Sequence, residues 1–75
     1  MATPEAALVE AAKRYLKQTY NEDTLAMTVT KNEVRDGNGV LAVECTVSWN
    51  GTRSDWTKQF TFKAGQVASM RAQPK

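Results

Sequence analysis

The stretch LAVECTVSWNGTRSDWTKQFTF, residues 41–62, decides the fold of this chain. Its first nine residues alternate between apolar and polar side chains, as in a β-strand with one buried face. Asn50-Gly51 follows, and this dipeptide favours a two-residue hairpin turn. The alternation resumes after the turn, with the large aromatic residues on one parity. We therefore predict a β-hairpin of strands at about 40–49 and 52–63.

A two-residue loop fixes the register of this hairpin. The predicted pairs are Trp49 with Thr52, Cys45 with Trp56, and Leu41 with Phe60. In that register the apolar residues of both strands share one face, as a half-buried sheet requires.

Residues 4–20 carry a different period. Their apolar residues recur three and four positions apart, which predicts an amphipathic helix. Thr3 is the expected N-cap and Pro4 the expected first helical residue. Asn21-Glu22-Asp23 has low helix propensity and is expected to end the helix.

Alternation returns at Leu25, Met27 and Val29, which predicts a strand at about 24–35. A turn cluster follows at residues 36–39. A three-residue loop there would pair Val29 with Cys45 and Met27 with Val47, on the same face as the other apolar residues.

The last predicted strand covers about 66–71 and follows a turn at Ala64-Gly65. A two-residue loop would point Val67 inward and Met70 outward, whereas a loop one residue longer would do the reverse. The tail, residues 72–75, is expected to fray. The first and last strands are sheet edges, which are natural templates for pairing with another chain.

These elements predict one α+β domain over residues 1–75: a helix packed on a four-stranded antiparallel meander. The layout resembles the cystatin-like arrangement, in which a curved sheet wraps around one helix. The Gln-Val-x-Val-Ala-Gly hairpin of protease-inhibiting cystatins is absent, because the hairpin reads Ser48-Trp49-Asn50-Gly51-Thr52. The resemblance therefore implies the fold and not the inhibition of proteases.

Composition limits the functional classes. Ten Lys and Arg against eight Asp and Glu give a net charge of +2, which permits an anionic partner without arguing for one. One cysteine and no histidine exclude an internal disulfide and argue against a structural zinc site, so no cofactor is expected. We find no signal-peptide pattern and no apolar run of about 20 residues, and we expect a cytoplasmic protein without membrane contact.

No catalytic set can be assembled, and we expect no enzyme. Cys45 lies mid-strand on the apolar face with no histidine to activate it, so it is expected to be a core cysteine. Glu33, Glu44 and Asp55 are expected to lie on solvated surface, where they serve solubility rather than acid–base chemistry.

Lys31 and Lys58 fall on the apolar face on either side of Val43, with Glu33 close by. One interpretation is that both lysines extend beyond the helix to water and that Glu33 pairs with one of them. The other interpretation is an anion or acidic-peptide site at the open end of the sheet.

Aromatic and cationic residues alternate along the main hairpin, a pattern typical of surfaces that stack single-stranded bases. The parity of Trp56, Phe60 and Phe62 instead places them under the helix, with Trp49 at the hairpin tip as the exception. The candidate binding residues are Lys31, Glu33, Lys58, Trp49 and Arg53.

The expected function is a non-enzymatic protein-interaction module. A chain this small has a thin stability margin, which favours a homodimer formed through an edge strand or through the threonine-rich polar face of the sheet. The alternative is a weak single-stranded nucleic-acid-binding domain.

Overall fold

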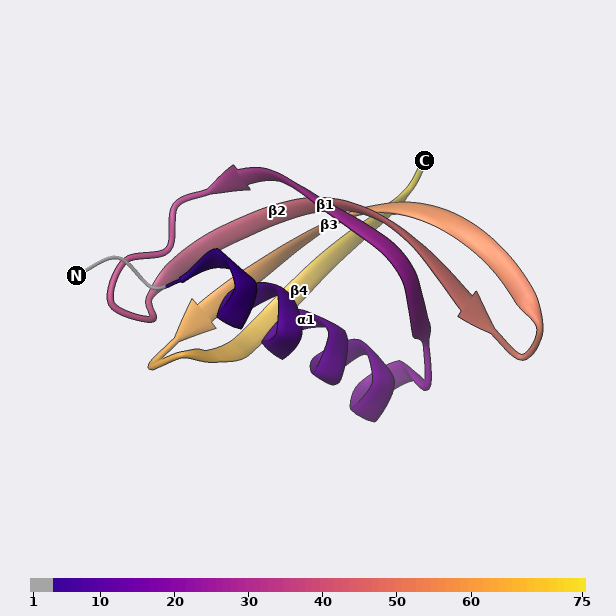
Figure 1. Ribbon diagram of the computed structural model, residues 1–75, viewed down its shortest axis with the longest axis horizontal. Helices are drawn as coiled ribbons and strands as arrows, with labels where there is room; N and C mark the ends of the chain where they lie inside the picture. Colours follow the sequence, from indigo (N-terminus) through magenta and orange to yellow (C-terminus); the bar gives the residue numbers. More distant parts are fainter. Residues whose placement is uncertain (1–3) are drawn as a thin grey trace.

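The computed structural model describes residues 4–75 as one helix and one antiparallel sheet. The elements are α1 (Glu5–Tyr20), β1 (Asp23–Asn32), β2 (Gly39–Trp49), β3 (Thr52–Lys63) and β4 (Gln66–Pro74). The strands lie in the order β1-β2-β3-β4. The sheet is strongly curved and arches over α1 (Figure 1). The predicted α+β layout is confirmed.

The concave face of the sheet and one face of α1 enclose the core. Leu8, Ala12 and Leu16 recur every four residues along α1 and are buried. They pack against buried side chains of the two central strands: Leu41, Val43, Cys45, Val47, Phe60 and Phe62. Phe60 and Phe62 are therefore core residues, as their parity predicts.

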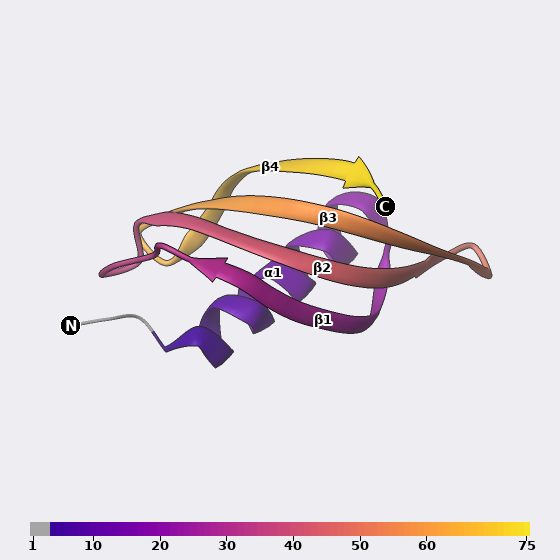
Figure 2. The same ribbon diagram turned by 90° about the horizontal axis from the view of Figure 1, so that it is seen from above.

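The register of the β2–β3 hairpin is confirmed at all three predicted pairs. Asn50 and Gly51 both have positive φ, 52° and 81°, as a type I′ turn requires. The tip of this hairpin projects beyond the end of α1 (Figures 1 and 2). Residues at the tip that share the core parity are consequently left uncovered by the helix.

The predicted register between β1 and β2 is wrong by two residues. Met27 pairs with Cys45, and Val29 pairs with Val43. A shift of two keeps both residues on the core face, because side chains alternate with a period of two. One residue of this shift comes from the turn, because the bridge between Arg35 and Asn38 closes a two-residue turn at Asp36-Gly37 in place of the predicted three-residue loop. The other comes from a bulge between Val29 and Lys31.

The connection over residues 33–38 folds against the turn between β3 and β4. The Gly65 N–H donates to the Gly37 carbonyl at 3.0 Å, and the Ala64 N–H donates to Asn38 Oδ1 at 3.1 Å. Val34, in the same connection, is buried in the core. The two loops thus close one end of the sheet together.

β1 contains two bulges, one between Thr24 and Ala26 and one between Val29 and Lys31. The first bulge leaves Leu25 51% exposed, so the prediction that Leu25 faces the core is wrong. The second bulge precedes the end of β1 at Asn32, short of the predicted end at residue 35.

β4 also contains a bulge, opposite Thr61 and Phe62. Val67 pairs with Phe62 and Met70 pairs with Phe60, so both pack on the core face. Neither predicted loop gave this result, because each assumed an unbroken alternation. The prediction that residues 72–75 fray is also wrong, since β4 continues to Pro74.

The two ends of α1 can be compared with the predicted start and end of the helix. Thr3 lies outside the described residues, and Pro4 is the N-cap rather than the first helical residue, with ψ of 131°. Asn21 adopts a left-handed conformation, and the Glu22 N–H donates to the Leu16 carbonyl at 3.2 Å. This capping ends the helix at the predicted place and fixes the backbone of Glu22. No helix within residues 4–75 is long and apolar enough to cross a membrane.

Candidate functional site

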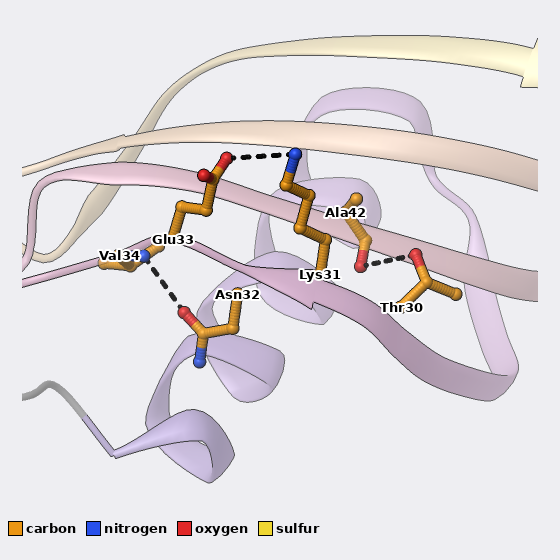
Figure 3. A network of polar contacts seen from close by, with 6 residues as sticks. All are labelled: Thr30, Lys31, Asn32, Glu33, Val34 and Ala42. Carbon is orange, nitrogen blue, oxygen red and sulfur yellow. Dashed lines mark hydrogen bonds and ion pairs between the residues drawn. The ribbon is translucent and has the colours of Figure 1, made fainter.

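Lys31 and Lys58 lie on opposite faces of the sheet, contrary to the prediction. Beyond the second bulge of β1, Lys31 pairs with Ala42, which is on the convex parity of β2. Figure 3 shows the side chains of Lys31 and Glu33 on one side of the strand and that of Asn32 on the other. The bulge inserts one residue and so reverses which face Lys31 occupies.

The predicted pairing of Glu33 is confirmed for Lys31, with 3.4 Å between Lys31 Nζ and Glu33 Oε1. The Lys31 side chain is 63% exposed, and an ion pair this exposed contributes little to stability. The neighbouring polar contacts shape the end of β1. Thr30 Oγ1 donates to the Ala42 carbonyl, and Asn32 Oδ1 accepts the Val34 N–H (Figure 3).

Lys58 is the candidate residue whose surroundings are most unusual. It pairs with Val43 in the middle of β3 and points to the concave side, where it is 2% exposed. Its Nζ lies 2.6 Å from Glu22 Oε1. The predictions that Lys58 reaches water and that Glu33 lies close by it are therefore wrong: its ammonium is buried and its partner comes from the α1–β1 connection.

Two aromatic rings flank this ion pair. Lys58 Nζ lies 5.4 Å from the ring centroid of Trp56 and 6.0 Å from that of Tyr20, within range of a cation–π attraction. Trp56 Nε1 donates to Ser54 Oγ at 2.8 Å, which fixes the indole. Among residues 4–75, Glu22 is the hydrogen-bond acceptor of Lys58, and the two other ammonium N–H groups have none.

A hollow of about 270 Å³ lies next to this ammonium, between the end of α1 and strand β4. We name it the Lys58 hollow, and its lining residues are Tyr20, Glu22, Trp56, Lys58, Met70 and Ala72. It combines an aromatic and aliphatic wall with one buried ion pair. That combination is typical of sites that bind a small apolar molecule by a single polar group.

Cys45 lies opposite Trp56 and is buried. Burial raises the pKa of the Cys45 thiol above its ordinary value; Glu22 and Asp55 also raise this pKa, and the positive charge of Lys58 opposes them. A thiol that stays protonated at neutral pH is a poor nucleophile. Among residues 4–75, no group of three His, Cys, Asp or Glu side chains gathers closely enough to hold a metal ion.

Trp49 and Arg53 lie at the tip of the β2–β3 hairpin, on opposite faces. Trp49 is 55% exposed, as predicted for the tip, while Arg53 pairs with Ser48 on the convex parity. Because Phe60 and Phe62 are buried and Trp56 is half-buried, the sheet presents no exposed row of aromatic rings within residues 4–75.

The convex face of the sheet is polar, and some of its charged side chains pair within the face. Thr46 Oγ1 donates to Asp55 Oδ1 at 2.6 Å, and Lys75 Nζ lies 3.1 Å from Glu44 Oε1. These contacts pair Asp55 and Glu44 within one copy of the chain, so both carboxylates are already occupied without a partner.

The two edges of the sheet differ in regularity. β1 is interrupted by its two bulges, whereas β4 pairs with β3 without a break from Ser69 to Pro74. The Lys75 N–H donates to the Asp55 carbonyl, so the odd residues of β4 bond to β3. Since bonding alternates along an antiparallel strand, the backbones of Met70 and Ala72 face the uncovered edge.

Comparison of the chain with protein-family models, with curated proteins and with solved structures finds no match.

Proposed function

We propose that this chain is a non-enzymatic protein-interaction module that forms a homodimer through the uncovered edge of β4. The carrying observation is the regular run from Ser69 to Pro74, which leaves a row of backbone groups on the outer side of the sheet. Regular uncovered edges pair readily with a second strand, and bulged edges such as β1 resist such pairing.

The edge offers a definite set of hydrogen-bonding groups. Met70 and Ala72 each contribute one N–H and one carbonyl, as their alternation with Lys75 requires. Pro74 contributes a carbonyl and no N–H. A partner strand must therefore match two donors spaced two residues apart.

A second copy of β4 satisfies this set when the two-fold axis passes through Ala72. Ala72 then exchanges both of its hydrogen bonds with Ala72 of the second copy, and the Met70 N–H donates to Pro74 of the second copy. Arg71 lies beside Gln73 of the second copy. An axis through Arg71 would instead oppose two arginines, and like charges opposite one another destabilise a sheet.

Single-stranded nucleic-acid binding is the weaker alternative. Of the candidate stacking residues, Trp49 alone is largely exposed in the part of the chain that the structure describes. One ring at a hairpin tip does not make the aromatic platform that such binding uses.

The experiment is light scattering coupled to gel filtration over a range of protein concentrations. Ala72→Pro removes an N–H from the uncovered edge and leaves the ladder with β3 intact, because proline is tolerated where the N–H faces outward. Ala72→Val keeps that N–H and is the matched control. We expect dimers for the wild type and Ala72→Val, and folded monomers for Ala72→Pro.

Two results would contradict the proposal. One is a wild-type protein that stays monomeric at the highest concentration reached. The other is an Ala72→Pro protein that dimerises as strongly as Ala72→Val. Circular dichroism of both variants establishes that each retains the sheet.

A further inference from the structure

Burial of the Lys58 ammonium is energetically unfavourable for so small a core. Among residues 4–75, Lys58 is the one charged side chain that is buried. Removing an ammonium from water is unfavourable, and apolar residues of similar volume are often at least as stabilising as a buried ion pair. Packing alone therefore gives no reason for a lysine at this position.

A hollow beside Lys58 offers an explanation for the buried lysine. The Lys58 hollow measures about 270 Å³, just below the range of about 300–1,000 Å³ that holds drug-sized ligands. Tyr20 and Trp56 flank the ammonium, and Met70 and Ala72 belong to the same wall. A molecule of one small ring fits the size and the apolar character of this space.

The polar group of the ligand follows from Glu22. Its carboxylate lies 2.6 Å from Lys58 Nζ, which shows that the ammonium at this position binds a carboxylate. The other two N–H groups have no acceptor among residues 4–75. From this geometry we propose that the Lys58 hollow binds a small aromatic carboxylate, with its carboxylate on Lys58 and its ring beside Tyr20 and Trp56.

Glu22 is the internal competitor of this ligand. Its backbone is held by the hydrogen bond to Leu16, but its side chain is 16% exposed and reaches the surface of the hollow. An incoming carboxylate either displaces the Glu22 carboxylate into water or binds beside it against repulsion. Neutralising Glu22 therefore strengthens binding, whereas neutralising Lys58 abolishes it.

The probe is phenylacetate, and its neutral match is phenylacetamide, which has nearly the same shape. In a Trp49→Phe background, the fluorescence of Trp56 reports on the hollow alone, since the chain has two tryptophans. We expect a saturable change with phenylacetate and binding of phenylacetamide that is about tenfold weaker, because hydrogen bonds to charged acceptors are about twice as strong as neutral ones.

Variants separate a binding role of the ion pair from a structural one. Glu22→Gln is expected to bind phenylacetate about tenfold more tightly, and Lys58→Met is expected to show no saturable change. Lys31→Met, which removes an exposed lysine of the convex face, is the matched control and is expected to bind as the wild type does. Amide NMR spectra verify that each variant is folded.

Three outcomes would overturn the proposal: equal affinity for phenylacetate and phenylacetamide, weaker binding by Glu22→Gln, or no saturation with the folded Trp49→Phe protein. If Lys58→Met does not fold, the Glu22→Gln and phenylacetamide comparisons still decide the question. The hollow is lined by residues of one copy of the chain, but Met70 and Ala72 also lie at the proposed β4 interface. All titrations therefore use one protein concentration, at which dimer formation affects every variant alike.

Discussion

At the scale of single residues, Cys45 makes the stability of the folded protein depend on pH. Burial raises the pKa of its thiol, so the folded state holds the thiol proton more tightly than the unfolded state does. The resulting stabilisation is complete below the ordinary thiol pKa of about 8.5 and is lost as the pH rises through the raised pKa. We expect the stability advantage of the wild type over Cys45→Ala, measured by urea unfolding, to shrink between about pH 7 and pH 10.

Val43→Ala is the control for this experiment. Val43 is buried on the same strand, two residues away, and carries no titratable group. Its substitution leaves a cavity whose cost does not depend on pH, so the difference from the wild type is expected to stay constant. A constant difference for Cys45→Ala as well would contradict the prediction.

Residue by residue, the sequence predicts only part of the candidate site. Alternation correctly places Lys58 on the concave side, and the adjacency of Lys31 and Glu33 correctly predicts their pairing. The partner of Lys58 was missed, because Glu22 lies 36 residues earlier and reaches Lys58 only through the capping turn after α1. The one available signal was a carboxylate directly after the helix, which also fits a solvated turn.

At the scale of elements, the docking of the 33–38 connection on the β3–β4 turn can be tested with two glycines. Gly37 and Gly51 have nearly equal φ, 82° and 81°, so an added side chain costs each about 1–2 kcal/mol in backbone strain. At Gly51 an added Cβ meets open space, whereas at Gly37 it would lie 2.5 Å from the Gly65 nitrogen. We expect Gly37→Ala to lower the free energy of unfolding by about 1–2 kcal/mol more than Gly51→Ala does.

Chemical denaturation of both variants measures this difference, and Gly51→Ala is the matched control for backbone strain. The extra loss at Gly37 arises because the Gly65 backbone must move away, which breaks the hydrogen bond from the Gly65 N–H to the Gly37 carbonyl. Equal losses for the two variants would mean that the connection does not dock on the turn.

The elements also differ in how well the sequence predicts them. The β2–β3 hairpin is predicted in full because Asn50-Gly51 fixes a local turn and every later pair follows from it. β1 and β4 are predicted as strands, but their bulges are not. The position of a bulge depends on how residues such as Val67 and Met70 pack on the core. The local alternation of apolar and polar residues does not predict that packing.

At the scale of the whole molecule, the curved sheet has two buried central strands, β2 and β3, and two edge strands, β1 and β4, that differ in regularity. β2 and β3 carry most of the core, so their amides are expected to exchange slowest with solvent. The edges exchange faster because half of their backbone N–H groups face outward. Exchange measured along the chain therefore shows which edge, if either, becomes covered on association.

We expect the amides of Met70 and Ala72 to become protected from hydrogen exchange as the protein concentration rises, because the proposed dimer gives each of them an acceptor. Met27, which pairs with Cys45, faces the uncovered edge of β1 by the same alternation and is the internal control. Its exchange is expected to stay independent of concentration. Ala72→Pro should remove the concentration dependence at Met70, since the two hydrogen bonds belong to one interface. Protection that instead appeared at Met27, or at both edges equally, would place the interface elsewhere and refute pairing through β4.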